Sequence, residues 1–187
     1  MEEHEIYMKV PVKLWEFQLV NTENYTIETL HGAIKKIIID SGDFQKRRTN
    51  LKADMTDYNM MHHDAFRIVA QNVEHLIKKW VFENTPGQLH MQINHSSCWG
   101  ASYSKNDYAV KHSHFPALFS YIYYVQASED SAPLYFPAEP GTYYKPTSGT
   151  GIIFPGWVEH EVPAHETSDE RIAVVGNLEG TIVPNRL

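Results

Sequence analysis

The sequence contains a single cysteine, Cys98, in 187 residues. One thiol excludes an internal disulfide and any zinc site built from several thiolates, and it suits the reducing cytoplasm, where we expect the protein. No apolar run approaches the about 18 residues that a membrane-spanning helix needs, so no membrane partner is expected. Residues 1–5 are acidic, whereas a secretion signal begins with basic residues, so no such signal is predicted.

An excess of basic residues is also lacking. There are 16 Lys and Arg against 23 Asp and Glu, which gives a formal net charge of −7. Proteins that bind nucleic acids through phosphate contacts are generally basic, so no nucleic-acid partner is expected. The 42% hydrophobic and 21% charged residues are typical of a globular chain, and the length suits one domain spanning residues 1–187. Histidine, in contrast, is unusually frequent with 11 residues, which directs attention to metal binding.

Two amphipathic helices are predicted in the first half of the chain. Thr26 is a typical helix N-cap, and apolar residues recur at helical spacing from Ile27 to Ile38. The same spacing over residues 63–82 predicts a second helix. The polar segment 44–59 between them is interpreted as a loop. Together with the tyrosine-rich turn 141–146, this loop is a candidate rim for a substrate site.

The remaining pattern favours β-strands. The segment 119–125 is almost wholly apolar or aromatic, which predicts a strand buried on both faces. Further strands are expected at 6–17, 88–94, 99–103, 134–136, 151–154, 160–162 and 171–178. This order predicts an α+β domain whose β part is a sandwich or barrel with the helices packed on one sheet.

Three histidines are candidates for a metal site. His112 and His114 are separated by one residue, so in a strand their side chains point to the same face. A third ligand, His160, can approach from a strand 46 positions after His114. Imidazole binds Fe, Zn, Cu or Ni, and three ligands on one side of the ion leave positions for substrate or oxygen. The alternative is that all three are ordinary surface or core histidines.

The residues around these histidines follow a wider order. The pair precedes the hydrophobic strand, and the later segments are 132–136, 151–162 with His160, and 170–178 with Arg171 eleven residues after His160. In this order, residues 88–178 resemble the 2-oxoglutarate- and Fe(II)-dependent dioxygenases. Within that superfamily, the chain is most similar to prolyl-hydroxylase-like proteins and to an uncharacterised group from marine bacteria and phages. The resemblance implies a double-stranded β-helix, the cupin-like jelly roll, over about 88–178 with helical support from about 25–85.

The resemblance also implies cofactors and the residues that hold them. Fe(II) would be bound by the catalytic residues His112, His114 and His160, and 2-oxoglutarate would be the cosubstrate. Arg171 matches the arginine that pairs with the distal carboxylate of 2-oxoglutarate, for which a planar, always charged guanidinium is suited. Tyr124 matches the tyrosine that donates a hydrogen bond to the same carboxylate.

Two further cosubstrate contacts follow from the same resemblance. Tyr103 matches a tyrosine near the metal end of the cosubstrate. Asn177 lies at even spacing from Arg171, so on a strand it is expected to point to the cavity and contact cosubstrate or substrate.

The sequence departs from the family pattern at one ligand. The second ligand of the family is usually Asp or Glu, whereas here it is His114. Three neutral imidazoles leave Fe(II) its full charge, which weakens the affinity or changes the preferred metal. We expect a three-histidine site. In a second interpretation, His112 and His160 bind the metal and His114 lies outside, with water or another residue such as Asp107 in the third position.

The implied function is that of a 2-oxoglutarate- and Fe(II)-dependent dioxygenase. We expect a hydroxylase that uses O2 on an unidentified small molecule or protein side chain and releases succinate and CO2. A cupin-type three-histidine metal oxygenase that does not use 2-oxoglutarate is one alternative, and it gives Arg171 no cosubstrate to hold. A catalytically inactive jelly roll with a binding or structural role is another, because the carboxylate ligand is missing.

Overall fold

The computed structural model describes residues 11–41, 50–84 and 91–182 of the chain. The helices are α1 (Ile27–Asp40) and α2 (Asp64–Asn84), and a short 3-10 helix over Met60–His62 precedes α2. One sheet contains β1 (Trp15–Gln18), β3 (Asp54–Met55), β4 (Met91–Tyr103), β6 (Phe119–Gln126), β9 (Thr150–Pro155) and β11 (Arg171–Ile182). The other contains β2 (Leu51–Lys52), β5 (Tyr108–His112), β7 (Leu134–Tyr135), β8 (Tyr143–Tyr144) and β10 (His160–Val162).

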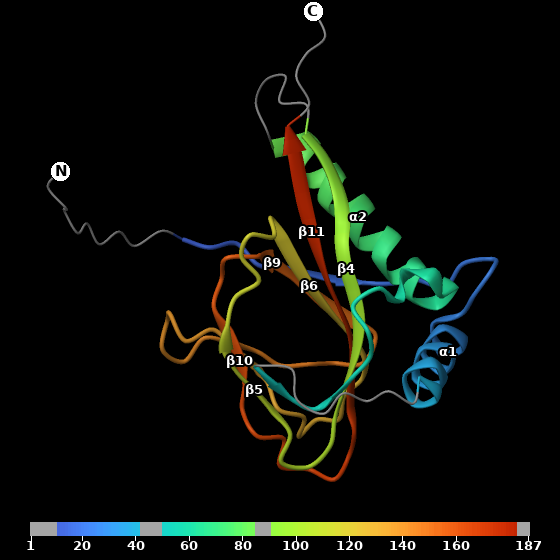
Figure 1. Cartoon of the computed structure of the whole chain (residues 1–187), viewed down its shortest axis with the longest axis vertical. Coiled ribbons are helices and arrows are strands. Elements are labelled where there is room, and N and C mark those ends of the chain that lie inside the picture. The colour runs from blue at the N-terminus through green and yellow to red at the C-terminus, as the bar shows by residue number, and fades with distance from the viewer. Residues whose placement is uncertain (1–10, 42–49, 85–90, 183–187) are drawn as a thin grey trace, which may run out of the picture.

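Two antiparallel sheets enclose the centre of the molecule, and both helices lie outside the larger sheet (Figure 1). The strand order is β1-β9-β6-β11-β4-β3 in the larger sheet and β2-β5-β10-β7-β8 in the smaller one. Neighbouring strands are mostly distant in sequence, as in a jelly roll. The predicted α+β class, with a jelly roll and helices packed on one sheet, is therefore confirmed.

Local sequence signals explain both helices. Thr26 caps α1 as predicted, since its hydroxyl accepts from the Thr29 N–H while the Thr29 hydroxyl accepts from the Thr26 N–H. The buried face of α1 consists of Leu30, Ile34 and Ile38, which recur at helical spacing. α2 occupies nearly the predicted range and buries its own apolar face on the same sheet. The helices thus cover the outer side of the larger sheet.

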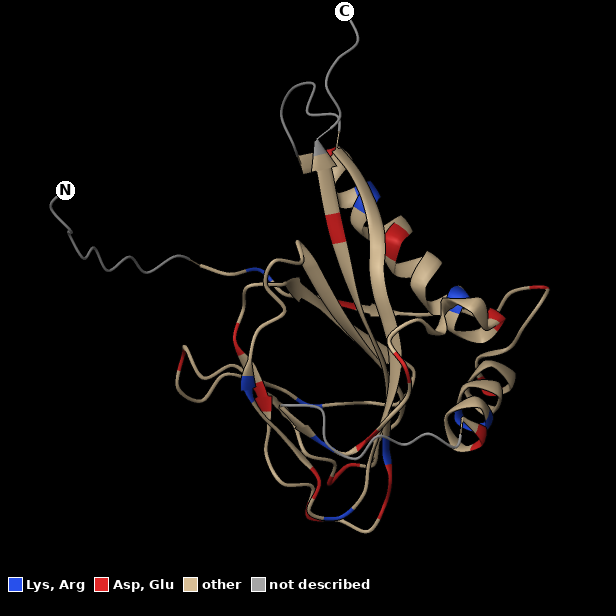
Figure 2. Ribbon diagram, in the orientation of Figure 1, with Lys and Arg blue, Asp and Glu red and all other residues tan. Residues whose placement is uncertain are grey.

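Strand β6 lies between two cores. Tyr121, Tyr123 and Val125 point to the helices, and Ile122 and Tyr124 point to the space between the sheets. Seven of its eight residues are buried, which confirms the expectation of a strand covered on both faces. Charged residues lie mainly on helices and loops, and β4, β6 and β9 carry none (Figure 2). A charged residue inside this sheet therefore needs a specific explanation.

The structure corrects several predicted boundaries. Within the segment expected as a loop, residues 51–52 form β2 and residues 54–55 form β3, and these strands add to the edges of the two sheets. Residues 91–94 and 99–103, expected in two separate strands, belong to the one continuous strand β4, because β11 pairs with β4 along its whole length. Residues 88–90 of the first expected strand lie outside the described residues. β1 begins at Trp15, and residues 6–10 of the strand expected at 6–17 lie outside the described residues. These strands are defined by pairing with distant segments, which local sequence does not reveal.

Among the described residues, no helix combines the length and the apolar character that crossing a lipid bilayer requires.

Candidate active site

Three histidines converge at one end of a pocket between the sheets. His112 ends β5 and His160 begins β10, and the two are directly opposite each other in this antiparallel pair. Their ring centroids lie 4.4 Å apart, and the ring of His114 lies 5.2 Å from that of His112 and 5.0 Å from that of His160. Nitrogen atoms from all three rings lie within 4.8 Å of one another. The expected cluster is present, and this spacing suits a single metal ion.

His114 reaches this cluster from a turn rather than from a strand. Because β5 ends at His112, the strand alternation argued from sequence does not position His114. Instead, the backbone of His114 is held on both sides. Its backbone N–H donates to the Gly156 carbonyl at 2.7 Å, and its backbone carbonyl accepts from the Ala117 N–H at 2.9 Å. Glycine is needed at position 156, because a Cβ there would lie 2.2 Å from the Ala117 carbonyl oxygen. Two interlocked turns therefore hold His114 in place.

Each of the three imidazoles has a hydrogen-bond acceptor at Nδ1. His112 Nδ1 lies 2.7 Å from the Val110 carbonyl oxygen, and His160 Nδ1 lies 3.0 Å from the Val158 carbonyl oxygen. A carbonyl can only accept, so both rings carry their proton on Nδ1 and present the lone pair of Nε2. Such contacts fix the tautomer and orientation of metal-binding histidines.

Burial also keeps the imidazoles uncharged. It lowers the pKa of His160 to about 3 and the pKa of His114 to about 4, and it lowers the pKa of His112 as well. Each lies close to the other two, which adds to the cost of a positive charge. A divalent ion therefore meets three neutral nitrogen ligands near pH 7 without having to displace protons from them.

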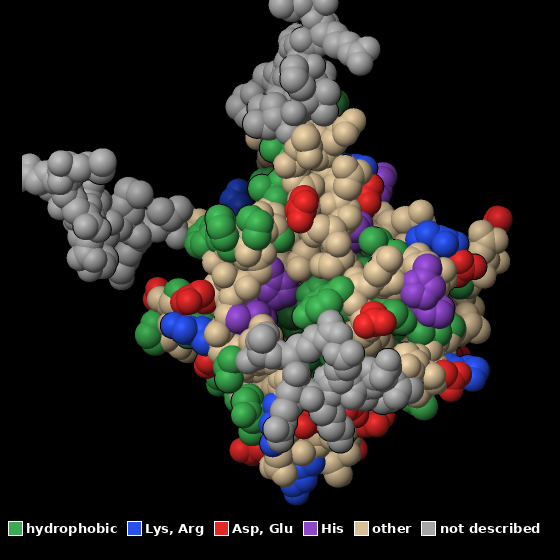
Figure 3. Space-filling model, in the orientation of Figure 1, with side chains coloured by type: hydrophobic (Ala, Val, Ile, Leu, Met, Phe, Trp, Pro, Cys, Tyr) green, Lys and Arg blue, Asp and Glu red, His purple; other side chains and the backbone are tan. Residues whose placement is uncertain are grey.

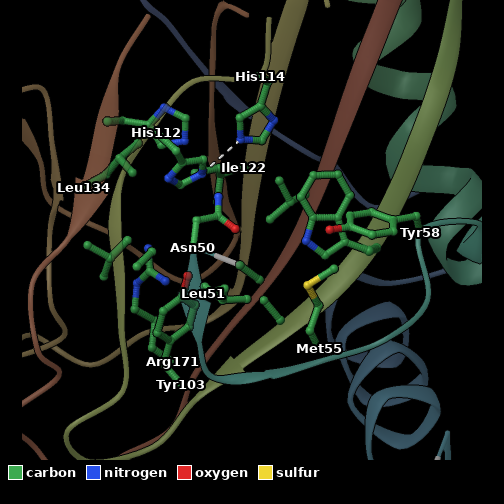
Figure 4. A pocket seen from close by; sticks show the side chains of 17 residues that line it. Asn50, Leu51, Met55, Tyr58, Tyr103, His112, His114, Ile122, Leu134 and Arg171 are labelled. Carbon is green, nitrogen blue, oxygen red and sulfur yellow. Dashed lines mark hydrogen bonds between the residues drawn. The ribbon is translucent and has the colours of Figure 1, made fainter. Parts of the chain in front are cut away.

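Arg171 lies at the opposite end of the pocket (Figure 4). It is 1% exposed, and among the described residues it is the only Lys, Arg, Asp or Glu that is buried. Its Nε and Nη2 atoms have no hydrogen-bond partner among the described residues, and the same holds for the buried hydroxyl of Tyr124. A buried guanidinium is costly unless an anion pairs with it. This end of the pocket therefore fits a carboxylate.

Two tyrosine rings flank the guanidinium. Cζ of Arg171 lies 4.6 Å from the ring centroid of Tyr103 and 5.1 Å from that of Tyr124. Burial raises the pKa of both phenols, and the positive charge of Arg171 only partly opposes this effect. Both hydroxyls therefore keep their protons and can donate hydrogen bonds. Tyr103 thus lies at the arginine end of the pocket, whereas the family resemblance implied a position near the metal end of the cosubstrate.

The wall between the two ends is mostly apolar, and histidine side chains are visible in a hollow beside hydrophobic ones (Figure 3). No Asp or Glu is among the described residues that line the pocket. Besides Tyr103, Arg171 and the three histidines, the lining consists of Asn50, Leu51, Met55, Tyr58, Trp99, Ala101, Ala109, Ile122, Leu134, Val162, Ala173 and Val175. Tyr124 contacts Arg171 but is not among the lining residues. Four of the lining residues come from residues 50–59, the described part of the segment 44–59 proposed as a substrate rim, whereas residues 44–49 lie outside the described residues. None comes from the turn 141–146. The wall can accept an uncharged substrate group.

Two aromatic residues of this wall were not singled out from the sequence, although Tyr58 lies within the segment 44–59 proposed as a substrate rim. The Trp99 ring stacks on His114 with 5.8 Å between centroids and 19° between planes, and Tyr58 packs edge-on against Trp99 at 5.1 Å. Alternation along β4 contained a signal for Trp99, because it shares a strand face with the predicted Tyr103. Tyr58 had no such signal, since it follows β3 in an irregular segment.

Asn177 points toward the histidines, but it is not among the residues that line the pocket. Its Oδ1 lies 2.5 Å from His114 Nδ1 and accepts a hydrogen bond from the Ser120 hydroxyl at 2.8 Å. Its Nδ2 donates to the Ser97 hydroxyl at 3.1 Å. The amide therefore contacts a histidine of the cluster and two serines, where the sequence suggested a direct contact with cosubstrate or substrate.

Two other residues considered from sequence lie outside the site. The carboxylate of Asp107 accepts from the Ser104 N–H at 2.8 Å within a tight turn, and it does not belong to the three-histidine group. Cys98 is fully buried in the core under the helices, where burial raises its pKa to about 12. Asp107 therefore stabilises a turn, and Cys98 packs as a small apolar residue.

Comparison with solved structures identifies the fold. A viral collagen prolyl hydroxylase from Paramecium Bursaria Chlorella virus-1, in complex with 2-oxoglutarate, aligns with a TM-score of 0.68 and 14% identity over 90% of this chain and 96% of the viral one. A prolyl-4-hydroxylase from Pseudomonas putida aligns with a TM-score of 0.67 and 15% identity over 89% and 91% of the two chains. HygX from Streptomyces hygroscopicus, with nickel and 2-oxoglutarate bound, aligns with a TM-score of 0.60 and 10% identity over 90% and 83%.

The sequence comparisons found no match. No family model matches the chain, and no curated protein sequence matches it. At such low identity, the structural likeness defines the fold and not the activity. The sequence resemblance is thus confirmed at the level of architecture: the chain has the fold of the 2-oxoglutarate- and Fe(II)-dependent oxygenases.

Proposed function

We propose that this protein is a 2-oxoglutarate- and Fe(II)-dependent dioxygenase that hydroxylates an as yet unidentified substrate and releases succinate and CO2. The observation that carries the proposal is the buried guanidinium of Arg171, which shares one pocket with three neutral histidines. A cosubstrate that chelates a metal at one end and carries a carboxylate at the other matches both ends of this pocket. The shared fold with enzymes crystallised with 2-oxoglutarate supports the same assignment.

The donor set suits the proposed metal. His112, His114 and His160 would hold Fe(II) through their Nε2 atoms, since the Nδ1 atoms are engaged with acceptors. Imidazole is a suitable ligand for Fe(II), and three such ligands leave coordination positions for cosubstrate and O2. When bound, the iron supplies the redox chemistry that couples decarboxylation of 2-oxoglutarate to substrate oxidation.

The residues at the other end bind and orient the cosubstrate. Arg171 would pair with its distal carboxylate, and the hydroxyls of Tyr124 and Tyr103 would donate hydrogen bonds beside it. The pairing gains strength from burial, because few water molecules compete with it. The apolar wall that includes Trp99 and Tyr58 would exclude water from the reaction and hold the substrate group to be oxidised.

Anaerobic titration with Fe(II) and then 2-oxoglutarate tests this function, with visible absorption as the readout. We expect a weak charge-transfer band that requires both components, together with slow O2-dependent formation of succinate. Arg171→Gln should retain metal binding and lose the band at the same cosubstrate concentration. Metal binding without the band would overturn the use of 2-oxoglutarate and favour the three-histidine oxygenase that does not need it. Absence of metal binding would favour an inactive jelly roll.

A further inference from the structure

We propose that Asn177 is a positioning residue that selects the metal-binding tautomer of His114. Through this contact, the surroundings of position 114 favour a histidine over the carboxylate that is usual in the family. This inference rests on the proposed metal site and deepens it. It concerns how one ligand is oriented, and it does not depend on the identity of the substrate.

The three histidines differ in what holds Nδ1. For His112 and His160, the acceptor is the backbone carbonyl two residues earlier, at Val110 and Val158. This contact is local and would survive most side-chain substitutions. His114, in contrast, uses the side-chain amide of Asn177, which is 63 positions away in sequence. The orientation of only this imidazole therefore depends on a replaceable side chain.

The sheet register places Asn177 for this role. Asn177 lies on the central strand β11, directly opposite Ser120 on β6 and Ser97 on β4. The Ser120 hydroxyl donates to its Oδ1, and its Nδ2 donates to the Ser97 hydroxyl. Both ends of the amide are therefore engaged, so a row of three polar side chains across three strands directs Oδ1 at His114 Nδ1. Immediately after Asn177, a bulge between Asn177 and Leu178 shifts the pairing register of β11 with β4.

The consequence for His114 follows from hydrogen-bond chemistry. With Oδ1 as the acceptor, the ring proton resides on Nδ1 and the lone pair of Nε2 faces the other two histidines. Indeed, Nε2 of His114 lies 3.3 Å from Nε2 of His112. An Asp at position 114 has no proton to donate near pH 7, so it would face an acceptor atom. The acceptor atom of Asn177 therefore requires a hydrogen-bond donor at position 114, which an imidazole supplies and a carboxylate does not. This match argues that His114 is a functional metal ligand and not the result of losing a carboxylate ligand.

Two substitutions separate positioning from mere filling of space. Asn177→Leu keeps the approximate volume and removes the acceptor, whereas Asn177→Asp keeps an acceptor oxygen. The control is Asn72→Leu on α2, which lies on the other side of the large sheet and whose amide donates to the Ile68 carbonyl. The first readout is the tautomer of each histidine ring, from long-range ¹H–¹⁵N NMR spectra of the metal-free protein. The second is the affinity for Co(II), from its visible absorption in competition with a chelator.

We expect His114 in the Nδ1–H form in the wild type and in Asn177→Asp, with Co(II) affinity in the Asp variant at least equal to that of the wild type. Asn177→Leu should shift His114 to a mixture of tautomers and weaken Co(II) binding about 10- to 100-fold, the range seen when supporting residues of metal ligands are removed. Asn72→Leu should match the wild type in both respects.

Three results would overturn the inference. They are an Nε2–H tautomer at His114 in the wild type, an unchanged tautomer and affinity in Asn177→Leu, or equal losses in the Leu and Asp variants. Should Asn177→Leu fail to fold, the wild-type tautomer and the Asp variant still decide the question. Neither readout uses 2-oxoglutarate, so failure of the proposed enzymatic function and failure of this inference are distinguishable.

Discussion

His112 and His160 lie directly opposite each other on β5 and β10, with 4.4 Å between their ring centroids. This register places two of the three candidate ligands on neighbouring strands of the same sheet. Because strand pairing holds both backbones, the fold itself sets the distance between these two imidazoles. Such preorganisation lowers the cost of ordering the ligands at the moment of binding.

Removal of one of these ligands should abolish tight metal binding without unfolding the protein. We expect His160→Ala to weaken Co(II) or Ni(II) binding by more than about 100-fold, since loss of a ligand should exceed the loss seen for supporting residues. Isothermal titration calorimetry measures the affinity, and circular dichroism checks the fold. The matched control is His75→Ala, at an exposed position on α2, which should bind as the wild type does. Equal losses in both variants would point to non-specific metal binding by surface histidines.

Replacement of Arg171 should stabilise the ligand-free protein and abolish its response to 2-oxoglutarate. The guanidinium of Arg171 is buried, and its Nε and Nη2 atoms lack hydrogen-bond partners among the described residues. Because Arg171→Met removes this buried charge, the free energy of unfolding of the ligand-free protein should rise by about 1–4 kcal/mol. The same variant should lose the added stability that 2-oxoglutarate and metal confer on the wild type. Urea denaturation with and without ligands measures both effects.

The control for this substitution is Arg67→Met. The side chain of Arg67 is 47% exposed and pairs with Asp64 on the surface of α2, so its replacement should change stability by less than about 1 kcal/mol. If Arg171→Met destabilised the ligand-free protein, the guanidinium would have to be a structural element of the core and not a binding group.

The stability of the metal-free protein should fall as the pH drops below about 6.5. Burial lowers the folded-state pKa of His114 to about 4 and that of His160 to about 3, from the ordinary value of 6.5. Below pH 6.5 the unfolded chain therefore binds more protons than the folded one, so acid favours unfolding. The free energy of unfolding should fall by up to about 1.4 kcal/mol per pH unit for each such histidine.

Urea denaturation at several values between pH 7 and pH 5 measures this dependence. His114→Gln should reduce the slope by about one histidine's share, because the glutamine does not titrate. A wild-type free energy of unfolding that stays constant from pH 7 to pH 5 would contradict the burial of these imidazoles.

Cys98 should be unreactive in the native protein. Its side chain is fully buried, the Tyr121 hydroxyl donates to its Sγ at 3.4 Å, and its pKa is raised from 9.0 to about 12. At pH 8 such a thiol is about 1,000-fold less ionised than an ordinary one, and only the thiolate attacks disulfide reagents. Labelling with a chromogenic disulfide should therefore be rapid in denaturant and at least about 1,000-fold slower without it. Comparable rates in the two conditions would place Cys98 at the surface.

Local patterns account for what could be predicted from sequence. The capping box at Thr26 and the apolar periodicity of both helices depend on residues three or four positions apart, so they are visible without a fold. The buried strand at 119–125 was visible because a strand covered on both faces has no polar alternation. The set of His112, His114 and His160, together with Arg171, was predicted from its order along the chain, which the family resemblance made interpretable.

Only the tertiary structure revealed how these residues meet. It placed His114 by a turn contact with Gly156, placed Tyr103 beside Arg171, and brought the amide of Asn177 to His114 Nδ1. The physical reason is that sheet register and turn-to-turn contacts join segments that are tens of residues apart, and no local signal specifies such pairings. The order of residues along the chain shows which side chains are of a type that can bind metal and carboxylate. The packing of the two sheets determined which of them share a pocket and in which orientation.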